Sequence, residues 1–210
     1  MKFAREAWPI VIPVAIIGSA LIALNAVTQG TLLGVIGFSA IVLAVGVLLF
    51  FRDPERYPPV NDNSVVSPAD GVVVDAQVLM DGQRLIAVFL SVFDVHVNRS
   101  PYAGVVKDVK RTPGTYLHAN SAAGIKGNER VEVLLETAHG LVSFTQLSGL
   151  VARKISCRIT KGDVLKTGDR YGLIYFGSRM ELILPATAKI CVRNGDRVKA
   201  GETVVALFES

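Results

Sequence analysis

The stretch TKGDVLKTG (residues 160–168) recurs in outline as RNGDRVKAG (residues 193–201), and both copies follow the pattern G-D-x-x-K-x-G. Glycine adopts a positive φ without steric cost, and an aspartate side chain readily accepts a hydrogen bond from the backbone of its own turn. Each copy therefore predicts a tight turn beside a short apolar strand. The chain thus contains an internal repeat of a β-turn unit.

The paired turns resemble the barrel-sandwich architecture of biotinyl and lipoyl carrier domains. Those domains carry their modified lysine on a tight hairpin between two half-repeats. The corresponding segment here is FGSRM (residues 176–180), which contains no lysine. The resemblance implies a carrier-like fold with a different reactive residue, and it places Gly177 and Ser178 at the tip of a hairpin.

From Val65 onward the chain consists largely of short apolar runs rich in β-branched residues, which Gly, Asp and Asn separate. No window has a sustained apolar period of about 3.6 residues. We therefore predict a mainly β fold, a barrel-sandwich-like β domain with at most one or two short helices. The predicted strands cover residues 72–74, 85–90, 131–135, 141–147, 171–176 and 180–184.

The N-terminal region carries no charged side chain between residues 7 and 51. At about 1.5 Å per residue, the apolar runs 10–27 and 31–51 are each long enough to cross a hydrocarbon core about 30 Å thick. We predict that residues 1–51 form a transmembrane or membrane-embedded helical hairpin with its turn at residues 28–30. A cleaved signal peptide is disfavoured, because the first run is too long and a second run follows directly.

Basic residues flank the hairpin on both sides. Lys2 and Arg5 precede the first run, and Arg52 and Arg56 follow the second. The positive-inside rule places both flanks in the cytoplasm. We therefore expect the chain at the cell membrane, with residues 52–210 as a β domain on its cytoplasmic face.

The composition narrows the range of partners. The chain has 22 Lys and Arg residues against 18 Asp and Glu, a net charge of +4, which suits an anionic membrane surface. The basic residues are spread out with few aromatic residues between them, so we expect no nucleic-acid partner. Cys157 and Cys191 lie in no metal-ligand spacing, so we expect no metal and interpret both as buried small apolar residues.

Several short motifs occur in a fixed order. They are FFRDP (residues 50–54), SPADG (67–71), FDVHVNR (93–99), GNER (127–130), GLVARKI (149–155) and FGSR (176–179). In this order they resemble the phosphatidylserine decarboxylase proenzymes, in particular their short form, a group that includes archaetidylserine decarboxylase-like members. The resemblance covers about residues 50–210 and makes the β domain a catalytic one.

The resemblance implies a self-processing enzyme that cleaves itself between Gly177 and Ser178. The products would be residues 1–177 and 178–210, held together as a heterodimer. Ser178 would become a pyruvoyl group, which can form a Schiff base with the amine of the substrate and accept the electrons released with CO2. No PLP is expected, since no lysine motif in a phosphate-binding pocket is found. The implied reaction converts phosphatidylserine into phosphatidylethanolamine, or acts in the same way on archaetidylserine.

The resemblance also implies roles for His96 and Asp70. His96 would protonate the carbanion left by decarboxylation, and Asp70 would help His96 to activate Ser178. The longer relatives have a second histidine three residues after the first, where this chain has Arg99. The base that activates Ser178 therefore stays open among His96 and the other two histidines of the chain, His118 and His139.

Two functions from other classes remain as alternatives. The repeat alone would allow a non-catalytic, membrane-anchored barrel-sandwich adaptor. Ser178, His96 and Asp70 could also form a serine hydrolase that does not cleave itself. The sequence is compatible with a homo-oligomer but does not specify one.

Overall fold

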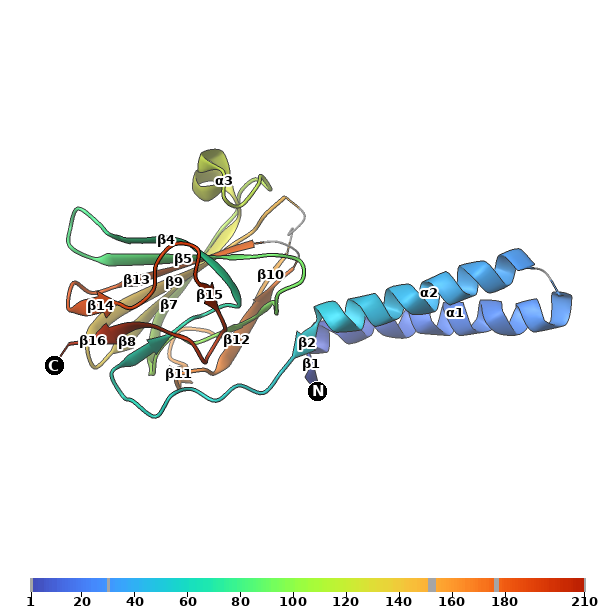
Figure 1. The fold of residues 1–210 in the computed structure, drawn as a ribbon, viewed down its shortest axis with the longest axis horizontal. Helices are drawn as coiled ribbons and strands as arrows, with labels where there is room; N and C mark the ends of the chain where they lie inside the picture. The colour runs from blue at the N-terminus through green and yellow to red at the C-terminus, as the bar shows by residue number, and fades with distance from the viewer. Residues whose placement is uncertain (1, 30, 151–153, 176–177, 210) are drawn as a thin grey trace. The chain divides into compact units, whose positions relative to one another are not determined.

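The computed structural model describes residues 2–29, 31–150, 154–175 and 178–209, and the chain divides into two compact units, Met1–Glu55 and Arg56–Ser210 (Figure 1). The N-terminal unit consists of β1 (Lys2–Phe3), the 3-10 helix η1 (Arg5–Ala7), α1 (Trp8–Thr28), α2 (Thr31–Phe50) and β2 (Arg52–Asp53). The C-terminal unit consists of β3 (Ser64–Val66), β4 (Gly71–Val78), β5 (Arg84–Leu90), β6 (Val97–Arg99), β7 (Gly104–Thr112), α3 (Ala122–Gly127), β8 (Arg130–Thr137), β9 (Gly140–Leu147), β10 (Ile155–Cys157), β11 (Val164–Leu165), β12 (Arg170–Ile174), β13 (Ser178–Leu184), β14 (Ala188–Ile190), β15 (Arg197–Val198) and β16 (Val204–Phe208).

Helices α1 and α2 form the predicted hairpin. Gln29 caps the C-terminal end of α1 with a left-handed φ of 49°, and α2 begins at Thr31. A Cβ on Gly37 would lie 2.7 Å from the backbone oxygen of Gly18, so small residues permit the close approach of the two helices. By length and composition both helices could cross a membrane. The predicted helical hairpin is therefore confirmed.

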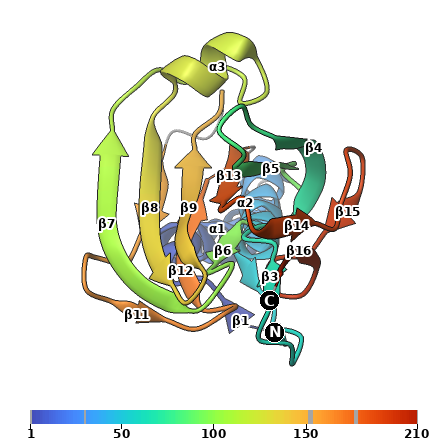
Figure 2. The same cartoon turned by 90° about the vertical axis from the view of Figure 1, so that its left-hand side faces the viewer.

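The C-terminal unit is built on an eight-stranded sheet with the order β11-β7-β8-β9-β13-β5-β4-β15. Figure 2 shows how this sheet curls. Two three-stranded sheets, β10-β12-β6 and β14-β16-β3, complete the unit. The strand order has an internal symmetry. Read inward from one edge it is β11, β7, β8 and β9, and read inward from the other edge it is β15, β4, β5 and β13, so that the strands of the two halves correspond one to one. The mainly β, barrel-sandwich-like prediction is confirmed, and α3 is the one helix in the described part of this unit.

The two repeated turns occupy equivalent places in this symmetric arrangement. The backbone N–H of Gly162 donates to β7 and that of Gly195 donates to β4, each at 2.8 Å. Their φ angles are +97° and +95°, which favour glycine. Asp163 and Asp196 each accept a backbone N–H of their own turn, at 2.8 and 3.0 Å. The turn chemistry predicted from the repeat is confirmed in both copies.

The symmetry includes a second repeat, which was not among the patterns found in the sequence. SPADGVVVD (residues 67–75) matches SPYAGVVKD (residues 100–108), and these segments lead into β4 and β7. Both strands shift register at the same place, between Val73 and Asp75 in β4 and between Val106 and Asp108 in β7. The two halves therefore share their bulges as well as their turns.

One half of this unit is continuous in sequence and the other is split. Residues 97–174 supply β6 to β12, whereas the other half combines β3 to β5 with β13 to β16. Ser178 is the first residue of β13, where the chain returns to the split half. The predicted hairpin is wrong, because β12 lies in a three-stranded sheet and β13 lies in the eight-stranded sheet. Gly177, the other residue of the predicted tip, lies outside the described residues.

The sheets pack face to face around a buried core. Tyr171 of β12 lies 4.9 Å from Phe144 of β9 between ring centroids, and its hydroxyl contacts the sulfur of Met180 at 3.8 Å. All three side chains are fully buried. This contact joins the strand that precedes Ser178 to the strand that begins with it.

The two cysteines differ in exposure. Cys157 on β10 is half-buried, and burial raises the pKa of its thiol. Cys191 follows the edge strand β14 and is exposed. The interpretation of both cysteines as buried is therefore wrong for Cys191, because an edge position leaves its side chain uncovered.

Candidate functional site

Ser178 faces the interior of the C-terminal unit. Its register partner on β5 is Leu90, and because side chains alternate along a strand, Ser178 shares the inner face with Met180 and Leu182. Ser178 is 0% exposed, and its Oγ has no hydrogen-bond partner among the described residues. Leaving a buried hydroxyl unsatisfied costs about 1–3 kcal/mol. Packing alone does not account for a serine at this position.

A second serine lies opposite Ser178 on the other neighbouring strand. Arg179 pairs with Leu147 on β9, so one further step along both strands matches Ser178 with Ser148. The ladder to β8 continues here, since the Ser148 N–H donates to the Glu129 carbonyl at 2.9 Å. Ser148 is also 0% exposed, and within the described residues its Oγ has no partner. Two buried hydroxyls therefore lie at neighbouring places, one directly after β9 and one at the start of β13.

Asn128 of the GNER motif fixes the backbone on one side of this pair. Its Nδ2 donates to the carbonyls of Ser148 at 2.9 Å and Leu117 at 2.7 Å. Its Oδ1 accepts the Leu117 N–H at 2.8 Å. A single buried amide thus ties the end of β9 to the loop before α3.

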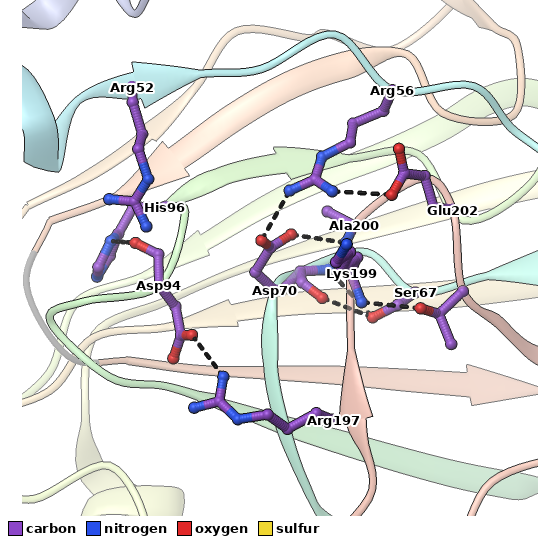
Figure 3. A network of polar contacts seen from close by, with 12 residues as sticks. Arg52, Arg56, Ser67, Asp70, Asp94, His96, Arg197, Lys199, Ala200 and Glu202 are labelled. Carbon is purple, nitrogen blue, oxygen red and sulfur yellow. Dashed lines mark hydrogen bonds and ion pairs between the residues drawn. The ribbon is translucent and has the colours of Figure 1, made fainter.

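Asp70 lies directly before β4 in a charged network (Figure 3). Its Oδ1 accepts the Ala200 N–H at 2.7 Å, and its Oδ2 accepts Arg56 Nη2 at 2.9 Å. Arg56 also donates to Glu202 at 2.8 Å. The Asp70 side chain is 12% exposed and the Arg56 side chain 9%, so this pair is shielded from solvent. The carboxylate is held in one orientation by a backbone donor and a buried guanidinium.

The internal repeat shows that the turn does not need an aspartate at position 70. In the second copy, SPYAG (residues 100–104), the equivalent position is Ala103. Ser67 and Ser100 make the same bond in both copies, because each hydroxyl donates to the carbonyl two residues later at 2.7 Å. The turn therefore forms without a carboxylate, which favours a functional role for Asp70.

His96 is completely buried at the start of β6. Its Nδ1 lies 2.9 Å from the Asp94 carbonyl oxygen, and its own carbonyl accepts the Ile174 N–H of β12. Because a carbonyl only accepts, Nδ1 carries a proton, and in the neutral ring Nε2 is the proton acceptor. The Asp94 carboxylate accepts the Ser91 N–H and hydroxyl at 2.8 and 2.7 Å, and Arg197 lies 3.3 Å from it (Figure 3).

The three predicted site residues converge on one end of the β structure. Asp70 and Ser178 lie at the same end of β4 and β13, the two neighbours of β5. His96 bonds to Ile174, the last residue of β12, shortly before the chain reaches Ser178. The contacts given above link Asp70 to Arg56 and Ala200, and His96 to Asp94. The catalytic roles of Ser178, His96 and Asp70 stay predictions.

The other two histidines lie elsewhere. His118 stacks on Phe89, with ring centroids 6.0 Å apart, and Phe89 faces the outer side of the sheet because it alternates with the register partner of Ser178. His139 lies in the turn between β8 and β9, at the far end of β13 from Ser178. At about 3.3 Å per residue, β13 separates its two ends by about 20 Å. His96 is the histidine best placed to act at Ser178.

Arg99 occupies a structural position. It is 4% exposed, its Nη1 donates to the Gly168 carbonyl at 3.0 Å, and its Cδ would lie 2.8 Å from a Cβ on Gly201. Gly168 and Gly201 end the two repeated turns. Arg99 therefore joins the two halves of the unit and does not replace the acid-base chemistry of a histidine.

Sequence reasoning missed Arg56 as the partner of Asp70, and it missed Gln146, Ser148 and Asn98. The available signal was polar residues at inner positions of an apolar strand, since Val142 and Phe144 precede Gln146 and Ser148 at alternate places in β9. Among the described residues, no group of three His, Cys, Asp or Glu side chains could hold a metal ion.

Comparisons with known proteins show one family. A family model described as phosphatidylserine decarboxylase matches residues 43–206. A phosphatidylserine decarboxylase proenzyme of Chlorobium chlorochromatii is 43% identical over 178 residues, covering 82% of this chain and 84% of the relative. Proteins of the same description from Pelobacter propionicus and Geobacter metallireducens are 42% and 38% identical, covering 89% and 98% of this chain and 90% and 96% of the relatives.

These similarities define a class of enzyme. The relatives are carboxy-lyases of phospholipid metabolism, and their descriptions as proenzymes denote processed precursors. The chain belongs to the phosphatidylserine decarboxylase family. Membership in a family of enzymes disfavours the adaptor alternative.

Proposed function

We propose that this protein decarboxylates phosphatidylserine to phosphatidylethanolamine after cleaving its own chain between Gly177 and Ser178. The observation that carries the proposal is the buried Ser178 Oγ, which has no hydrogen-bond partner among the described residues. A nucleophile without competing bonds suits an attack on the carbonyl that directly precedes it in the chain. That attack would convert the peptide bond into an ester, and β-elimination would then release residues 1–177 with a terminal carboxylate and leave dehydroalanine at position 178. Hydrolysis of the imine form of this residue would release its nitrogen as ammonia and leave the pyruvoyl group.

The position of Ser178 fits a pyruvoyl group made from this residue. Its side chain lies on the inner face of β13, and Ser148, whose hydroxyl also has no partner among the described residues, directly follows the neighbouring strand β9. When formed, such a group supplies a carbonyl that accepts the electrons released as a carboxylate leaves as CO2. His96 would deliver the proton that replaces the carboxylate, and Asp70 with Arg56 would hold the polar network beside it. Archaetidylserine shares the serine head group, so assays with both lipids would separate the two substrates.

The mass of the purified chain tests the cleavage. We expect two fragments, residues 1–177 and 178–210, and a small fragment without a free amino terminus. Native conditions should keep them together, because β13 pairs on both sides with β5 and β9 and β16 pairs with β3. A single intact chain in an active preparation would contradict the proposal and favour a serine hydrolase.

We further propose that the catalytic unit lies at the cytoplasmic face of the cell membrane. The two flanks of the helical hairpin pair with each other as β1 and β2, and Lys2 lies 2.7 Å from Glu55. Both flanks of a spanning hairpin therefore lie on one side, and their basic residues favour the cytoplasm.

Deleting residues 1–51 should release a unit that still cleaves itself. Arg56–Ser210 forms a compact unit that contains Asp70, His96 and Ser178. Activity on lipid in vesicles should fall more than cleavage does, because the catalytic unit loses its tether to the membrane that contains its substrate. Electrophoresis and CO2 release measure the two effects, and an uncut, aggregated product would show that the hairpin is needed for folding.

A further inference from the structure

Two further polar atoms beside Ser178 are buried without a partner. Within the described residues, Asn98 Nδ2 and Gln146 Oε1 make no hydrogen bond, and both residues are 0% exposed. A buried polar atom that never binds a partner destabilises the folded chain. A pair of unsatisfied amides next to a reactive serine therefore indicates a ligand.

Asn98 and Gln146 lie beside β13, the strand that begins with Ser178. Gln146 is the register partner of Met180, the next residue after Ser178 on the inner face of β13. Its Nε2 donates to Asn98 Oδ1 at 2.9 Å, which joins β9 to β6. Gly172 leaves room for this bond, because a Cβ there would lie 2.8 Å from the same nitrogen.

The hydrogen-bonding capacity of the pair does not depend on how the amide oxygens and nitrogens are assigned. In either arrangement, one N–H and one C=O are used between the two side chains. As assigned, the N–H groups of Asn98 Nδ2 and the carbonyl oxygen of Gln146 then have no partner among the described residues. His96 lies two residues before Asn98 and shares its side of the extended chain, so a proton-transfer group lies close to both.

We propose that Asn98 and Gln146 are positioning residues for the serine head group, an inference that rests on the proposed decarboxylation. The unused N–H donates to the carboxylate that will leave, and the unused carbonyl accepts from the amine. A neutral amide orients the carboxylate without the strong ion pair that an arginine would make with it. That difference matters, because stabilising the charged ground state would raise the barrier to its loss.

The substitution Asn98→Asp tests this inference directly. It keeps the shape of the side chain and its bond from Gln146, but it replaces the unused N–H with a carboxylate oxygen that repels the carboxylate of the substrate. We expect the chain still to be cut, and the KM for a short-chain, dispersed serine phospholipid to rise on the order of 10- to 100-fold. Inhibition by the matching ethanolamine phospholipid, which has no carboxylate, should change less than about threefold by the same reasoning.

The control is Gln77→Glu, which adds the same charge at an exposed position of β4. It should leave unchanged both the KM for the serine lipid and the inhibition by the ethanolamine lipid. The proposal would be overturned if Asn98→Asp weakened binding of the serine and ethanolamine lipids equally, or weakened binding of neither. If Asn98→Asp stays uncut, Asn98→Ala carries the same comparison without a new charge. Loss of cleavage in both would assign the pair to processing and also overturn it. A wild-type chain that releases no CO2 would instead refute the proposed function.

Discussion

Ser178→Ala is expected to remain one uncut chain with no measurable decarboxylase activity. Alanine removes the only atom of this side chain that can attack the preceding carbonyl, and the same substitution removes the source of the pyruvoyl group. The loss should therefore be complete in both steps. Electrophoresis under denaturing conditions and release of CO2 from a carboxyl-labelled serine lipid measure the two outcomes.

Folding of this variant should be unaffected, since the hydroxyl makes no hydrogen bond among the described residues and its removal breaks none. Ser148→Ala is the matched control, because it deletes an equally buried hydroxyl, directly after β9, that also has no partner among the described residues. It should still yield two fragments. Ser178→Cys and Ser178→Thr keep a nucleophile and should be cut slowly. Activity in an uncut Ser178→Ala chain would refute the pyruvoyl assignment.

The sequence was sufficient to predict the fold class, because the determinants are local. Glycine and aspartate specify each repeated turn through their own backbone conformations, and these turns formed as expected at Gly162 and Gly195. The hairpin at Ser178 was predicted incorrectly for the converse reason. Whether β12 and β13 pair depends on which sheet each strand joins, and that choice is made by distant strands such as β5 and β9.

The site was predictable only in part. Ser178, His96 and Asp70 lie within recognisable motifs, but Asn98 and Gln146 acquire their meaning through one contact between β6 and β9. The alternation in β9 could have singled out Gln146, but no local pattern predicts its contact with Asn98. The histidines could not be distinguished from the sequence either. Strand register decides that His118 lies on the outer face and that His139 lies at the far end of β13.

The internal repeat offers a test of function that a sequence motif alone does not. Asp70 and Ala103 occupy equivalent turns with the same serine bond, so the fold tolerates either residue. Only the half that receives β13 carries the carboxylate, together with the buried Arg56 that binds it. This asymmetry between otherwise matched halves supports the proposed role of Asp70.

His96→Ala is expected to separate cleavage from turnover. Cleavage needs a base near Ser178 only once, whereas every decarboxylation must deliver a proton to the carbanion that remains after CO2 leaves. A positioned acid contributes on the order of 10²- to 10⁴-fold to such a step, so kcat should fall by that factor while the chain still appears as two fragments. The Nδ1 bond to the Asp94 carbonyl supports this role, because it holds the ring in one orientation and makes Nε2 the nitrogen that would take up and release the proton.

His96→Asn is the matched variant, since its Nδ2 lies where Nδ1 lies in histidine and can still donate to the Asp94 carbonyl, but the amide cannot carry a proton between groups. The same loss of kcat in both variants would attribute the effect to acid-base chemistry, whereas rescue by asparagine would attribute it to the hydrogen bond alone. An uncut chain would make His96 the base for cleavage. That result would fit the structure as well, because Arg99 is engaged with Gly168 and the other two histidines lie on the outer face and at the far end of the sheet. A variant that is both cut and fully active would leave His96 with a purely structural role.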